Sequence, residues 1–160
     1  MNDRVIHRKQ GHGYDEKYSD WRRSRYPNIV KATNHYCADV DWVEWRKGKP
    51  VAVIECRRAL YGKTLDDAVN SVHQLNNGFQ IELLATVAKN LNVAGYIVAI
   101  SDQNPEDRES YSKATFRVMQ VVIPNPYPTK FGTLVPELVK NLKKIDDYDE
   151  IGFANFLSKL

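Results

Sequence analysis

The chain has 160 residues, of which 42% are hydrophobic and 11% aromatic, and its formal net charge is +3 at pH 7. This is the length of about one domain, with enough apolar residues to bury a core, so we expect a single domain over residues 1–160. Two cysteines, Cys37 and Cys56, cannot form a four-ligand zinc site by themselves. No stretch approaches the ~20 apolar residues of a membrane span, and the first residues lack the apolar core of a signal peptide. We therefore expect a cytoplasmic protein with no membrane partner.

The first predicted element is a short amphipathic helix. Tyr14, Tyr18 and Trp21 follow each other at i, i+4 and i+7, and Pro27 would end the helix. The other face of this helix is basic, and basic charge is concentrated in the N-terminal third of the chain. Such a one-sided distribution favours a surface that attracts phosphate groups.

A β-hairpin is predicted next, from two strand-like runs at roughly 35–45 and 51–57 joined by the glycine-containing turn "RKGKP". From Thr64 to Leu91 the apolar residues keep a period of 3.6, for which one long helix is the simplest interpretation, and Gly78 leaves open a kink or break near "NNG". Residues 95–101 and 115–123 predict two buried strands. The segments "PELVKNLKK" and "DEIGFANFLSKL" predict two short helices. A strand, a crossover helix and a second buried strand predict a right-handed βαβ unit in a mixed sheet, so the fold class is α/β, or α+β in looser usage, with helices flanking the sheet.

Four charged residues of the hairpin are expected to meet at one end of the sheet. Asp39 and Asp41 share one face of the first strand, and Glu55 and Arg57 share one face of the second. Converging carboxylates repel each other unless a cation lies between them, and hard oxygen ligands suit Mg²⁺ or Mn²⁺ rather than zinc. The backbone carbonyl of Cys56 could add another oxygen. Arg57 would stabilise negative charge that develops on an attacked phosphate.

The run "ADVDWVEWRKGKPVAVIECRR" resembles the active-site hairpin of the PD-(D/E)XK nuclease-like superfamily, which has the restriction-endonuclease-like fold. In that superfamily, an Asp on one strand and a Glu-x-Lys on the next bind a divalent metal for phosphodiester hydrolysis. The resemblance implies that Asp41, or alternatively Asp39, takes the position of the Asp, Glu55 that of the Glu, and Arg57 that of the Lys. The element order is also similar to the superfamily's αβββαβ core, with two strands evident before the long helix instead of three.

The resemblance also implies two weaker site residues, Glu16 and Gln74, and contains two departures. The first helix of the family often adds an acid, for which Glu16 is the candidate here. Some relatives carry a Gln-x-x-x-Tyr motif in the later helix, whereas Gln74 is followed by Gly78. The missing tyrosine is one departure, and Arg57 is the other, because an arginine keeps the positive charge of the lysine but positions a water differently.

The function expected from these residues is that of an Mg²⁺- or Mn²⁺-dependent nuclease that hydrolyses DNA. Its expected nucleic-acid contacts are Arg22, Arg23, Arg25, Lys47, Lys49 and Arg58. Arg57 keeps an alternative open, a catalytically weak or inactive nuclease-like module that binds nucleic acid or a protein partner. A plainer alternative is a solvated salt bridge between Glu55 and Arg57. The sequence leaves open whether the chain forms a homodimer.

Overall fold

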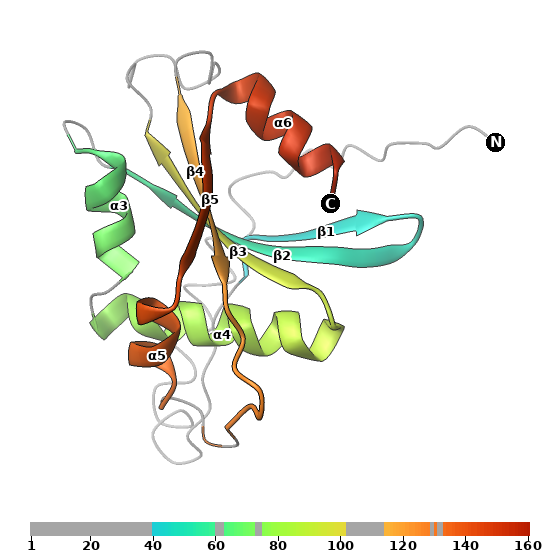
Figure 1. The fold of residues 1–160 in the computed structure, drawn as a ribbon, viewed down its shortest axis with the longest axis vertical. Helices are drawn as coiled ribbons and strands as arrows, with labels where there is room; N and C mark the ends of the chain where they lie inside the picture. The colour runs from blue at the N-terminus through green and yellow to red at the C-terminus, as the bar shows by residue number, and fades with distance from the viewer. Residues whose placement is uncertain (1–39, 60–62, 73–74, 102–113, 129, 131–132) are drawn as a thin grey trace, which may run out of the picture. The chain divides into compact units, whose positions relative to one another are not determined.

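The computed structural model describes residues 40–59, 63–72, 75–101, 114–128, 130 and 133–160, all within one compact unit that spans 38–160. Its elements are β1 (Trp42–Arg46), β2 (Lys49–Arg58), α3 (Leu65–Val72), α4 (Leu75–Leu91), β3 (Ala94–Ser101), β4 (Thr115–Val121), α5 (Val135–Lys140), β5 (Lys143–Tyr148) and α6 (Glu150–Ser158) (Figure 1). The predicted N-terminal helix lies outside the described residues. None of the described helices is long and apolar enough to cross a membrane.

The strands form one mixed sheet in the order β1-β2-β3-β4-β5. β1 and β2 are an antiparallel hairpin, β2 and β3 are parallel, and β4 and β5 continue the sheet in antiparallel fashion. Parallel neighbours need a crossover connection, and here α3 and α4 provide it between β2 and β3. The predicted α+β class and the predicted βαβ unit are therefore confirmed.

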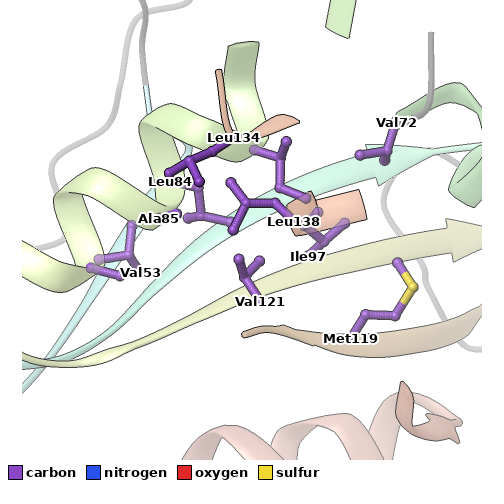
Figure 2. Close-up of a cluster of buried hydrophobic side chains, with 11 residues drawn as sticks. Val53, Val72, Leu84, Ala85, Ile97, Met119, Val121, Leu134 and Leu138 are labelled. Atoms are coloured by element: carbon purple, nitrogen blue, oxygen red, sulfur yellow. The ribbon is translucent and has the colours of Figure 1, made fainter. Parts of the chain in front are cut away.

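Each face of the sheet carries its own apolar cluster. Helices α3, α4 and α5 cover one face, where Val53, Ile97 and Val121 of the sheet pack against residues such as Leu84 and Leu138 (Figure 2). On the other face, Ile54, Val98, Phe116 and Val118 are buried beneath the partly buried aromatic residues of α6. Successive strand residues alternate between these two clusters, as the pleat requires.

The long helix expected over 64–91 is wrong as a single element. Two helices, α3 and α4, occupy that span, with residues 73–74 between them outside the described part of the chain. The residues "NNG", where a break was expected, lie inside α4. The predicted helix start is confirmed: Thr64 Oγ1 accepts a hydrogen bond from the Asp67 backbone N–H at 3.2 Å, and Asp67 Oδ2 accepts from the Thr64 N–H at 2.8 Å.

The C-terminal segment contains an element that the sequence pattern did not predict. Both expected helices are present as α5 and α6, but "KKIDDY" between them forms β5. Five of its six residues are exposed, and it pairs with β4 at the edge of the sheet. A charged edge strand is a common way to prevent pairing with other chains. The first hairpin strand is also shorter than expected, since β1 begins at Trp42.

Candidate active site

Asp41 lies next to the end of β2 although it is 15 positions earlier in the chain. It comes directly before β1, and its Oδ2 accepts a hydrogen bond of 2.7 Å from the backbone N–H of Cys56. The hairpin register explains this placement, because Trp42 pairs with Ile54 and the residues just before and just after them therefore face each other. The expected meeting of Asp41 with the Glu55-Cys56-Arg57 segment is present in the structure.

Glu55 and Arg57 project from the same face of β2 and form an ion pair. Glu55 is buried, with 5% of its surface exposed, and its Oε1 lies 3.4 Å from Arg57 Nη2. Both side chains are on the face that α3 and α4 cover, because they alternate in step with the core residue Val53. Arg57 Nε is also buried, and it has no hydrogen-bond partner among the residues that the structure describes. The plain solvated salt bridge does not fit a pair with side-chain exposures of 19% and 7%.

The pKa of the Cys56 thiol is raised by its surroundings. Burial, together with the negative charges of Asp41 and Glu55, raises the pKa of Cys56 to about 12. A thiolate is the species that attacks electrophiles and binds metal, and such a shift keeps the sulfur protonated. The Cys56 sulfur is therefore expected to remain a protonated thiol at neutral pH, mainly because it is buried and secondarily because Asp41 and Glu55 are negatively charged.

The described residues offer a small set of hard oxygen donors for a divalent cation. Asp41 uses one oxygen for the backbone, which leaves Oδ1 available, and Glu55 supplies a second carboxylate. The N–H and C=O of one strand residue point to the same side, so the Cys56 carbonyl also points toward Asp41. This set suits Mg²⁺ or Mn²⁺ in chemistry. Within the described ranges, no group of three or more His, Cys, Asp or Glu side chains is arranged to hold a metal ion.

The other expected site residues divide into two groups. Lys47 and Lys49 are exposed at the hairpin turn, where Lys47 and Gly48 both have positive φ, and Arg58 is exposed at the end of β2. The remaining candidates lie outside the described residues: Asp39, Glu16, Gln74, Arg22, Arg23 and Arg25.

Sequence reasoning missed a second arginine on the same face. The register aligns Arg57 with Ala99, and Ala99 with Arg117, so the two arginines occupy one row across three strands. Arg117 Nε and Nη2 donate to the Asp147 carboxylate at 2.8 and 3.0 Å, and its Nη1 pairs with Asp66 of α3. Two carboxylates thus neutralise Arg117, and it serves to join α3, β4 and β5. Only the strand register, which a sequence pattern does not supply, could have revealed it.

Comparison with known proteins identifies no relative whose site could be compared with this one. No protein-family model, no curated protein and no solved structure matches the chain. The functional argument therefore depends on the residues themselves.

Proposed function

We propose that the protein is a metal-dependent nuclease that hydrolyses phosphodiester bonds in DNA, at the end of β2. The observation that carries this proposal is the contact of Asp41 with the Cys56 backbone, which brings a second carboxylate beside the buried Glu55. A mixed sheet with this hairpin next to a parallel crossover is also compatible with a restriction-endonuclease-like core, which we propose as the fold family. The setting we propose is cytoplasmic.

Each residue has a distinct role in this proposal. Asp41, Glu55 and the Cys56 carbonyl would hold Mg²⁺ or Mn²⁺; Asp39 remains the alternative to Asp41. When bound, such an ion polarises a phosphoryl oxygen and makes a water more acidic. Arg57 is a donor only, so it cannot accept a proton from that water. Its guanidinium, on a side chain that is 19% exposed, would instead donate to a phosphate oxygen and offset charge that develops there.

One observation favours a second candidate function, a module that binds nucleic acid or a protein without cutting. Arg57 Nη2 lies 3.4 Å from Glu55 and supplies the positive charge that a cation would otherwise provide. If this ion pair persists when substrate is bound, Arg57 already neutralises Glu55 and weakens its attraction for a second cation. The two candidates therefore differ in whether a divalent cation competes with Arg57 for the Glu55 carboxylate.

The proposal is tested by calorimetric titration with Mn²⁺ combined with nicking of supercoiled plasmid. The wild type should bind Mn²⁺ and cut, whereas Asp41→Asn and Glu55→Gln should lose most of the affinity and the cutting, because each removes one anionic oxygen ligand. Asparagine keeps an oxygen that can accept from Cys56, so the fold should persist. Glu137→Gln on α5 is the matched control, since it removes an exposed carboxylate that belongs to none of the proposed site residues.

Arg57 variants separate the metal site from the chemistry. Arg57→Ala should retain Mn²⁺ binding but lose cutting by about two to three orders of magnitude, the usual effect of removing a preorganised donor. Arg57→Lys should retain or raise activity. Equal Mn²⁺ affinity in wild type, Asp41→Asn and Glu55→Gln would refute the metal site. Metal binding without cleavage of any DNA, linear, branched or single-stranded, would favour the binding module.

A further inference from the structure

The outer strand of the hairpin exposes an unusual amount of aromatic surface. Trp42 and Trp45 are 56% and 55% exposed, and both belong to β1, which is an edge of the sheet. Among the described residues no strand pairs with the outer side of β1. The opposite edge, β5, is instead covered with charges and exposes no aromatic ring to this extent. The two edges of the sheet therefore differ in their exposed chemistry, which is aromatic at β1 and charged at β5.

The two tryptophans lie on opposite faces of the hairpin. Trp42 is paired with Ile54 and so lies on the α6 face. The register shift near the turn falls on β2, so the residues of β1 alternate regularly and Trp45 lies on the other face. Arg46 confirms this alternation, because its Nη2 donates to the Leu157 carbonyl of α6 at 2.7 Å.

Positive charge accompanies the aromatic rings at the turn. Lys47 and Lys49 are exposed and form no ion pair with another described residue. Arg46, by contrast, is held by Glu44 and by the Leu157 carbonyl, which fixes the hairpin to α6. The free charges are thus at the tip of an anchored hairpin, next to exposed rings. Cations beside aromatic rings are the two components of surfaces that bind phosphates and stack bases.

We infer that β1 is a binding edge for single-stranded nucleic acid, with one base stacked on Trp42, another on Trp45, and the phosphates near Lys47 and Lys49. A flexible strand can cross the edge of the sheet and reach both faces, whereas a duplex stays straight over lengths far greater than this hairpin. Bases in a duplex are also stacked on each other and do not offer their faces to a side chain. The claim that this strand is the substrate of the site beside Asp41 rests on the proposed function, whereas the claim that β1 binds it does not.

The geometry also sets how far the bound strand must extend. Lys49 and Glu55 are six positions apart along β2, which is roughly 20 Å of extended backbone. Trp42, in contrast, directly follows Asp41 in the chain. A strand cut beside Glu55 would therefore stack first on Trp42 and reach the lysines several nucleotides farther on.

The test measures fluorescence anisotropy of a labelled oligothymidylate and of a fully paired DNA hairpin, in EDTA so that no cleavage occurs. The wild type should prefer the single strand. Trp42→Ala and Trp45→Ala should each weaken that binding by roughly tenfold, while the corresponding phenylalanine variants keep most of it, because a phenyl ring still stacks. Ile151→Ala, which removes another exposed apolar side chain on α6, is the control and should change nothing.

A salt titration tests the lysines separately. The double variant Lys47→Gln/Lys49→Gln should lower the slope of log affinity against log salt by about 1.4, at roughly 0.7 per phosphate contact on a single strand. Lys143→Gln on β5 is the matched control. A preference for the paired hairpin, or alanine variants that bind oligothymidylate as tightly as wild type, would overturn the inference. So would a dimer that the Trp42→Ala and Trp45→Ala variants convert to monomer without a change in DNA affinity.

These outcomes are distinct from those of the nuclease proposal. Binding through the tryptophans with no cleavage in Mn²⁺ would refute the nuclease and leave the binding edge in place. Cleavage of single strands at wild-type rate by both tryptophan variants would refute the binding edge and leave the nuclease proposal in place.

Discussion

The buried ion pair between Glu55 and Arg57 makes a stability prediction that does not depend on activity. At 3.4 Å and an effective dielectric constant of about 20, two unit charges attract each other by about 5 kcal/mol. Desolvation of both groups offsets much of this attraction, and the Arg57 side chain is still 19% exposed, so we expect a coupling of about 1–3 kcal/mol. Arg57→Met, which keeps the aliphatic stem, should therefore destabilise the fold by about 3 kcal/mol, because Glu55 loses this cation inside the protein.

Urea unfolding of the wild type, Glu55→Gln, Arg57→Met and the double variant measures the coupling directly. The double variant should be more stable than the sum of the two single effects predicts, since it leaves no buried charge of the pair behind. Additive effects within about 0.5 kcal/mol would refute the reasoning, because they would mean that the two side chains do not interact. The slope of each unfolding curve should stay the same, which shows that the unfolded states are comparable.

Two further predictions concern protonation. Hydrogen bonds from Arg117 lower the pKa of Asp147 to about 2. The contribution of the ionised Asp147 to the free energy of unfolding is therefore complete above about pH 4 and is lost as the pH falls toward 2. Asp147→Asn should reduce the free energy of unfolding by about 1 kcal/mol at pH 7, a value that allows for the 31% exposed side chain, and by almost nothing near pH 2. An equal loss at both pH values would contradict this ion pair. The pKa of Cys56, raised to about 12, predicts that a Cys37→Ser protein reacts slowly with iodoacetamide at pH 8 until it is unfolded in urea, and fast native alkylation would show that the thiol is not shielded.

Much of the sheet and the centre of the candidate site could be predicted because they depend on local patterns. Alternation along two nearby strands is enough to place Glu55 and Arg57 on one face, and a short turn fixes the register that brings Asp41 beside them. The burial of Glu55 could not be predicted, since it depends on how α3 and α4 cover the sheet.

The missed features all depend on contacts between distant parts of the chain. Strand β5 has Ile145 and Tyr148 as its only apolar residues, so nothing in its pattern indicates a strand until β4 is there to pair with it. Arg117 and Asp66 are 51 positions apart and meet only through the fold. The division between α3 and α4 falls before Leu75 and not near Gly78, and the sequence could not place it because the apolar period continues through the whole span.

The hydrogen bond from Cys56 to Asp41 affects how an aspartate at this position of a homologue should be interpreted. Because the carboxylate satisfies a backbone N–H at the point where β1 has not yet begun, an aspartate or asparagine is useful at position 41 for folding alone. Its retention in a homologue would therefore not distinguish an enzyme from a descendant that has lost its activity. The informative pattern is a homologue that keeps Glu55 and has lost the positive charge at position 57, because a buried carboxylate is costly to the fold and would then need a bound cation in place of Arg57.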